Sequence, residues 1–261
     1  MTLSFLGTGT SHGVPVIGCR CPVCRSSDPR DRRYRSSLLV REGDTSLIVD
    51  AGPEFRLQAL RARVESLDAL LLTHAHADHV HGLDDIRPLC REVPLPVYAD
   101  AACLQELKLR FSYVFREGGQ IGGGRPRMRL EKAAASFVVG SLEVESLPLL
   151  HGEMEILGWK LGDFAWMSDC SGIPARTMDI LRGSGGVATK RVAIGGLRAR
   201  AHPTHFSFME AIAAARAIGA VQTWIIHLTH DHSHEEVETI CRDFGADVGA
   251  RPAWDGLVLD S

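Results

Sequence analysis

The 261-residue sequence has no apolar run long enough to cross a bilayer and no excess of basic residues. A membrane-spanning helix needs about 20 consecutive apolar residues. Lysine and arginine number 29 against 32 for aspartate and glutamate, which disfavours a general nucleic-acid binder because such proteins usually carry a basic excess. Residues 1–13 have neither a basic start nor a long apolar stretch. We therefore expect no signal peptide, no membrane partner, no nucleic-acid partner and a cytoplasmic location.

The sequence also lacks internal repeats and any change of composition that would mark a linker. Strand-like runs alternate with segments of helical spacing, which is typical of a mixed α/β (α+β) protein, and we expect residues 1–261 to form a single domain. The expected strands are 3–6, 37–41, 46–50, 69–72, 94–99, 142–150, 156–161, 164–168, 191–195, 222–226 and 256–259. The expected helices are 53–63, 83–91, 101–115, 174–182, 207–218 and 234–243.

One segment between these elements, 116–129, is rich in glycine and arginine and predicts a mobile loop. Its arginines, Arg125, Arg127 and Arg129, suggest either contact with a substrate phosphate or a solvated face, and a solvated face is the more common role of such a charge run.

Three of the seven cysteines lie close together, at Cys19, Cys21 and Cys24, and the other four are scattered. In a chain without a secretion signal this spacing favours a metal knuckle over a disulfide framework. Free or redox-active thiols are the alternative.

The twelve histidines are also unevenly placed, with four within 74–81 and four within 227–234. The first group forms a HxHxDH run, residues 74–79, directly after an apolar strand. Four such ligands within six residues cannot all reach one ion. A turn that divides them between two adjacent ions is geometrically easier to form. Further ligands are expected where later strands end, and the sequence offers His151, Asp169 and His227. The alternatives are unrelated polar residues at strand ends or a metal-free protein.

These motifs resemble the metallo-β-lactamase superfamily, whose signature is HxHxDH followed in order by His, Asp and His. The Gly-rich segment 7–11, the Cys-x-Cys-x-x-Cys, the segment 202–207 and the segment 227–230 are similar to the PhnP-like branch of phosphoribosyl cyclic phosphate phosphodiesterases. The resemblance covers the chain from its first strand to Leu257. One departure is the segment 193–198, where the family usually carries an acidic residue and this chain has none.

The resemblance implies an αββα sandwich with two mixed β-sheets flanked by helices. It implies a first metal on His74, His76 and His151, a second on Asp78, His79 and His227, and Asp169 as the bridge between them. It also implies a structural zinc on Cys19, Cys21, Cys24 and His230. His205 matches a histidine that acts on the leaving group, so catalysis is assigned to His205 and to Asp78 as a metal ligand. A structural histidine is the alternative for His205.

Two divalent ions roughly 3.5–4 Å apart can hold a hydroxide and polarise a phosphoryl oxygen. We therefore expect a phosphodiesterase with two active-site ions, Mn or Zn with Fe as a further option, and one structural Zn, acting on a small phosphate ester such as phosphoribosyl cyclic phosphate or a nucleotide. Hydrolysis of a thioester, lactone or amide is an alternative, as is a non-catalytic metal-binding protein of cofactor biosynthesis. Processing of tRNA ends is disfavoured by the negative charge. A homodimer is one option for the oligomeric state.

Overall fold

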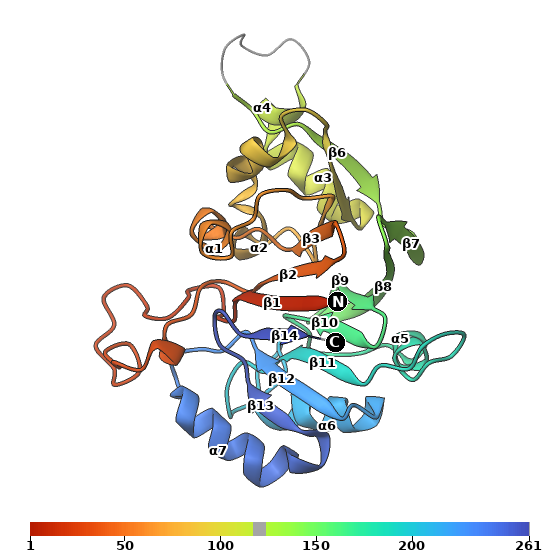
Figure 1. The fold of residues 1–261 in the computed structure, drawn as a ribbon. Coiled ribbons are helices and arrows are strands. Elements are labelled where there is room, and N and C mark those ends of the chain that lie inside the picture. The colour runs from red at the N-terminus through yellow and green to blue at the C-terminus, as the bar shows by residue number, and fades with distance from the viewer. Residues whose placement is uncertain (117–123, 261) are drawn as a thin grey trace.

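The computed structural model describes residues 1–116 and 124–260, and in them two β-sheets pack face to face with helices on both outer faces (Figure 1). This arrangement confirms the mixed α/β class and the αββα sandwich. The first sheet has the strand order β14 (Val258–Asp260), β1 (Thr2–Gly7), β2 (Ser37–Glu42), β3 (Thr45–Val49), β4 (Ala69–Leu71), β5 (Leu95–Ala99) and β6 (Met128–Lys132). The second has the order β13 (Ala250–Pro252), β12 (Gln222–Ile226), β11 (Arg191–Gly195), β10 (Phe164–Met167), β9 (Met154–Leu161), β8 (Leu142–His151) and β7 (Ser136–Val139).

The helices form the two outer layers of the sandwich. Those after β3 to β5 are α1 (Phe55–Arg61), α2 (Ala77–Val80), the 3-10 helix η2 (Leu83–Cys90), α3 (Ala101–Arg110) and α4 (Ser112–Phe115). Those of the second half are α5 (Ala175–Leu181), α6 (Phe208–Ile218), α7 (His234–Gly245) and the 3-10 helix η3 (Ala246–Val248), and a further turn, η1 (Pro29–Asp31), follows the cysteine loop. No helix in the described part of the chain is long and apolar enough to span a membrane.

Apolar side chains explain why the layers stay together. Between the two sheets lie Phe5, Trp159 and Trp166, all fully buried, and the rings of Phe5 and Trp166 have centroids 5.8 Å apart. Separate apolar clusters fill the space between each sheet and its helices. Because burial of apolar surface is the main favourable term in folding, these three clusters hold both sheets rigidly at the edge where the polar strand ends meet.

Local sequence signals place the two longest helices. Ser207 caps α6 and Ser233 caps α7, and in each case a glutamate three residues later closes the capping box. Helix α6 ends at Ile218, and its C-cap Gly219 has a φ of 87°, which is costly for other residues. The loops just before these caps carry His205, His227 and His230.

The structure differs from the sequence-based expectations mainly in short elements. Strands β6, β7 and β13 were not expected, and they form because neighbouring strands pair with them. The helix expected at 83–91 is a 3-10 helix containing Pro88, which cannot donate an α-helical hydrogen bond. The helix expected at 101–115 is interrupted at Phe111. In the expected loop 116–129, residues 117–123 lie outside the described residues, and β6 begins at Met128.

Candidate metal centre

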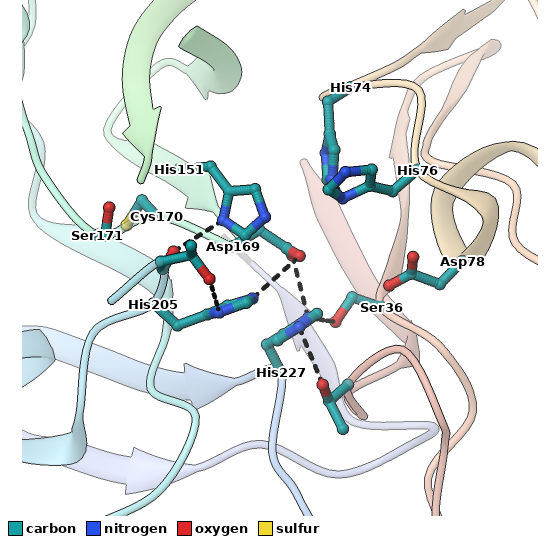
Figure 2. A network of polar contacts seen from close by, with 12 residues as sticks. Ser36, His74, His76, Asp78, His151, Asp169, Cys170, Ser171, His205 and His227 are labelled. Carbon is teal, nitrogen blue, oxygen red and sulfur yellow. Dashed lines mark hydrogen bonds and ion pairs between the residues drawn. The ribbon is translucent and has the colours of Figure 1, made fainter. Parts of the chain in front are cut away.

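Strand ends deliver most of the polar side chains of the site. The HxHxDH run follows β4, His151 ends β8, Asp169 lies two residues after β10, and His227 directly follows β12. Asp169 and His227 have positive φ angles, 52° and 61°. Such angles are uncommon for residues with a side chain, and here they turn the chain sharply so that both side chains enter the same space. Figure 2 shows His and Asp side chains meeting there from the two halves of the molecule.

Three histidines form the first group of ligand atoms. Potential ligand atoms of His74, His76 and His151 lie within 4.8 Å of one another, and Nε2 of His74 is 2.9 Å from Nδ1 of His76. The Nδ1 of His151 donates to the carbonyl oxygen of Thr204 at 2.7 Å. Because this hydrogen bond fixes the tautomer, Nε2 of His151 keeps its lone pair free for a metal.

A second group contains Asp78, Asp169 and His227, again with ligand atoms within 4.8 Å of one another. His79 adjoins it, because its Nε2 is 3.1 Å from Asp78 Oδ2 and 3.4 Å from Asp169 Oδ1. Nδ1 of His227 is 3.0 Å from the same Asp169 oxygen. Asp169 also groups with His74 and with His151, so its carboxylate lies between the two sets. We call these seven residues the histidine centre: His74, His76, Asp78, His79, His151, Asp169 and His227.

The donor set fits divalent metal ions. Nε2 of His79 and Oδ1 of Asp169 are fully buried and neither makes a hydrogen bond of good geometry. Unsatisfied buried polar atoms are costly, and a cation between them would satisfy both. Imidazole nitrogens with carboxylate oxygens are ligands that Zn, Mn and Fe accept.

The electrostatics of the histidine centre favour the metal-binding protonation state of His74, His227 and Asp169, but not of His79. Burial lowers the pKa of His74 well below its usual range and that of His227 to about 4, so both rings are neutral. Burial opposes ionisation of Asp169, but His227 and His79 outweigh it and lower its pKa. For His79 burial likewise opposes the charged form, and the surrounding carboxylates raise its pKa. A bound cation would replace the proton on His79 and supply positive charge beside the carboxylates in its place.

Two residues that support the histidine centre, Asp50 and Thr73, were not identified from the sequence. Oδ2 of Asp50 lies 2.7 Å from Nδ1 of His79 and also accepts from the hydroxyl of Thr73, while Oδ1 accepts from the Thr73 backbone. Asp50 is fully buried, with a φ of 59° directly after β3. It fixes His79 with Nε2 facing the site. Its position at the end of a strand is the signal by which it could have been found.

Two hydroxyl groups contact His227, and the sequence analysis assigned neither. The Thr10 hydroxyl is 3.1 Å from Nε2 of His227, and the Ser36 hydroxyl is 3.4 Å from Nδ1. Thr10 comes from the glycine-rich segment after β1, where Gly9 also bridges to Leu228. That segment therefore holds the His227 turn in place.

His205 lies at the rim of the histidine centre, on the loop between β11 and α6. Its Nε2 is 3.5 Å from Asp169 Oδ2, and its ring lies against that of His151 with centroids 4.6 Å apart. The side chain keeps 15% of its surface exposed. A group in this position can exchange a proton both with solvent and with a molecule bound at the centre.

The four residues predicted to hold a structural zinc also come together. Ligand atoms of Cys19, Cys21, Cys24 and His230 lie within 4.8 Å, and Nδ1 of His230 is 3.4 Å from both Cys19 Sγ and Cys21 Sγ. We call this set the cysteine knuckle. A backbone N–H from Cys24 and the His230 ring lower the pKa of Cys21 to about 6, which favours the thiolate that binds metal. His227 and His230 share one turn, so the two sites are neighbours.

The three loop arginines bond to their own surroundings. Arg125 donates to the carbonyl of Arg116, and Arg127 donates to the carbonyls of Arg91 and Glu92. Arg129 pairs with Glu131. Arg125 also donates to the carbonyl of Tyr113. None of these side-chain contacts, all within the described residues, joins the histidine centre.

Comparisons with known proteins identify the relatives of this chain. The model of the Beta-lactamase superfamily domain matches residues 45–228. An octanoyltransferase of Porphyromonas gingivalis is 41% identical over 232 residues, which are 88% of this chain and 46% of that protein. The chain spans less than half the length of the curated relatives it matches.

Two solved structures have the same fold. A diphosphatase from the PhnP family has a TM-score of 0.88 and 37% identity, and the match covers 99% of this chain and 96% of that one. Zn²⁺-bound PqqB from Methylobacterium extorquens has a TM-score of 0.77 at 19% identity and full coverage of both chains. From the matching family model and this shared architecture, the chain belongs to the β-lactamase superfamily and has the metallo-β-lactamase fold.

Proposed function

We propose that this protein is a metal-dependent phosphodiesterase that cleaves a small phosphodiester at a dinuclear site. The observation that carries the proposal is the arrangement of the histidine centre, in which two groups of ligand atoms lie on either side of one carboxylate, Asp169. The similarity to a PhnP-family diphosphatase over nearly the whole chain supports phosphorus–oxygen bonds as the target.

One ion would be held by His74, His76 and His151. The other would be held by Asp78, His79 and His227, and Asp169 would bind both ions. Bound there, two divalent cations would supply a hydroxide nucleophile at neutral pH and positive charge for the phosphoryl oxygens. Zn and Mn both suit this donor set, with Fe as a further option. The cysteine knuckle would hold a structural zinc, because four protein ligands leave no open position.

The chain's own groups would orient the substrate and manage protons. Asp50 and the Thr204 carbonyl hold the rings of His79 and His151 in fixed tautomers. His205 faces Asp169 from the opposite side to Asp78, as Figure 2 shows, and so would meet the leaving oxygen. A departing alkoxide needs a proton, and a protonated imidazole can give one.

The first test is hydrolysis of bis(4-nitrophenyl) phosphate by the purified protein, with and without added Mn²⁺ or Zn²⁺. We expect turnover that depends on metal and falls at least about 100-fold in Asp78→Ala, because that variant lacks a ligand of the second ion. Adenosine 2′,3′-cyclic phosphate and a phosphoribosyl cyclic phosphate then test the substrate class. Absence of turnover with either metal would contradict the proposal.

A second candidate is hydrolysis of an acyl thioester, which the 41% identity to an octanoyltransferase favours. A metal-activated hydroxide serves acyl transfer as well as phosphoryl transfer. Release of thiol from an octanoyl thioester, measured beside the phosphodiester assay, distinguishes the two. A non-catalytic role in cofactor biosynthesis, suggested by the PqqB fold, predicts that neither assay gives turnover.

We also propose that the substrate is the main partner, that residues 1–261 act as one domain, and that the protein works in the cytoplasm. A homodimer stays an alternative to a monomer. Light scattering of the purified protein measures its oligomeric state.

A further inference from the structure

A histidine to which the sequence analysis gave no role, His202, lies beside His205. Its Nδ1 is 3.2 Å from Nδ1 of His205, and the two rings have centroids 5.1 Å apart. Thr204 lies between them, with its hydroxyl 2.9 Å from His205 Nδ1 and 3.2 Å from His202 Nδ1. The same Thr204 accepts from His151 through its carbonyl, so this short segment is fixed against the histidine centre.

The hydrogen bonds assign the tautomer of His202. The backbone N–H of Thr204 donates to His202 Nδ1 at 3.3 Å. A backbone amide can only donate, so this nitrogen must carry a lone pair and the ring proton must lie on Nε2. Burial, His205 and the positive charge of Arg198 all lower the pKa of His202, in agreement with a neutral ring.

The state of His202 constrains His205. Two bare imidazole nitrogens 3.2 Å apart would bring their lone pairs together, whereas an N–H on one of them makes a hydrogen bond. Because His202 Nδ1 is the acceptor, Nδ1 of His205 must be the donor, and it can share its hydrogen with the Thr204 hydroxyl oxygen. The other nitrogen, Nε2, then faces Asp169 and the substrate space.

We propose that His202 is a positioning residue that keeps a proton on Nδ1 of His205, so that Nε2 of His205 is the atom that transfers a proton to the leaving group. This inference rests on the proposed function. It adds a residue that never touches the substrate, in the way that a carboxylate orients a catalytic histidine elsewhere.

A hydroxide oxygen forms the new bond to phosphorus, and the bond from phosphorus to the leaving oxygen breaks with its electron pair on that oxygen. The leaving oxygen takes the proton from Nε2 of His205, which leaves His205 neutral with its remaining proton on Nδ1, hydrogen bonded to His202. A solvent proton then returns to Nε2.

The first test does not depend on catalytic activity. A long-range ¹H–¹⁵N spectrum of the histidine rings, recorded on zinc-loaded protein and assigned with His205→Asn, reports which nitrogen of His205 bears a proton. We expect a protonated Nδ1 in the wild type and in His202→Asn, since an asparagine side-chain oxygen can accept in place of the ring nitrogen. In His202→Phe, which keeps the bulk but has no acceptor, we expect loss of that preference. A bare Nδ1 in the wild type would overturn the proposal.

The second test compares leaving groups. Methyl 4-nitrophenyl phosphate and methyl phenyl phosphate differ only in the basicity of the phenolate that departs, and the more basic phenolate depends more on acid catalysis. For His202→Phe we expect kcat to fall about 10- to 100-fold for the phenyl ester and less than about threefold for the nitrophenyl ester. We expect His202→Asn to restore most of the loss. A loss of equal size for both esters would indicate a merely structural role and would overturn the proposal.

Thr204→Val separates His202 from the neighbouring hydroxyl, because valine keeps the carbonyl that His151 uses. If the hydroxyl determines the His205 tautomer, Thr204→Val shifts the spectrum and His202→Phe does not, which would contradict our inference. If the wild type hydrolyses neither ester, the proposed function fails while the spectrum still decides the role of His202.

Discussion

The histidine centre and the cysteine knuckle lie on either side of one turn, yet they are built in different ways. The histidine centre takes its ligands from the ends of strands in both sheets, and six of its seven side chains are buried. The cysteine knuckle takes three ligands from one loop and the fourth, His230, from the turn after β12, and all four are partly exposed.

Support for the ligands differs as well. Rings in the histidine centre are oriented by groups outside the ligand set, such as Asp50 and the Thr204 carbonyl. In the cysteine knuckle the polar contacts are largely internal: the N–H of Cys24 donates to Cys21 Sγ, and the nearby N–H of Val16 donates to Cys24 Sγ. The fold therefore preorganises the histidine centre, whereas the loop of the cysteine knuckle would depend more on a bound ion.

The largest effect is expected when one ligand of the cysteine knuckle is removed. Cys21→Ser replaces a thiolate by a poor zinc ligand, and we expect the loss of about one zinc per chain. We also expect the free energy of unfolding to fall by about 3 kcal/mol, the contribution of an ion present at 100 times its Kd. Atomic absorption and thermal unfolding measure both quantities. Cys90→Ala, on η2, is the control and should keep its zinc. Unchanged zinc content in Cys21→Ser would disprove the structural zinc.

A smaller effect should follow from disturbing the support of the histidine centre. In Asp50→Asn, the new side-chain amide can donate to Nδ1 of His79, which moves the ring proton to Nε2, where the metal would bind. We expect kcat or metal affinity to fall about 10- to 100-fold, as when such supporting carboxylates are lost elsewhere. Asp68→Asn, a carboxylate that accepts from Ser46, is the control. Titration with Zn²⁺ and steady-state kinetics measure the difference, and equal behaviour of the two variants would refute this role of Asp50.

The smallest effect concerns the start of α7, four residues after His230 of the cysteine knuckle. His234 is buried, and its Nδ1 accepts from the Arg33 guanidinium at 3.1 Å. Burial and Arg33 lower the pKa of His234 to about 4. Because the folded-state pKa lies below the usual value, the stabilisation is complete above about pH 6.5 and is lost as the pH falls toward 4.

We therefore expect the wild type to lose about 2 kcal/mol relative to His234→Gln between pH 6.5 and pH 4. Glutamine cannot titrate, so the difference between the two proteins isolates this one group. Urea unfolding at several pH values measures it. Parallel curves for the two proteins would show that His234 does not titrate in this range.

The sequence predicted the features that are local or periodic. The HxHxDH run and the strand-end positions of His151, Asp169 and His227 follow from patterns of adjacent residues, and the structure brings these side chains together. The sandwich fold was implied by the resemblance to a known family. Strand β7 and strand β13 were missed because each has only three or four residues and depends on pairing with a neighbour. No pattern within such a short segment specifies the partner strand.

Residues that support the site through a hydrogen bond were harder to predict from the sequence. Asp50 lies 29 residues before His79 in the chain, and only the pairing of β3 with β4 brings them together. The role of His202 depends on how the turn at Thr204 folds back on itself. The resemblance to a known family named the ligands, but contacts of this kind depend on tertiary structure.

The first and last strands, β1 and β14, pair with each other in the first sheet. Thr2 and Asp260 lie opposite each other where β1 and β14 run antiparallel, and Figure 1 shows the two ends side by side. A linker of a few residues could therefore close the chain into a ring. New ends opened at the exposed glycines 185 and 186 would leave every ligand on its own strand. Such a circular permutant should fold and keep the histidine centre and the cysteine knuckle, and a second domain attached before Thr2 or after Asp260 would project from the same place.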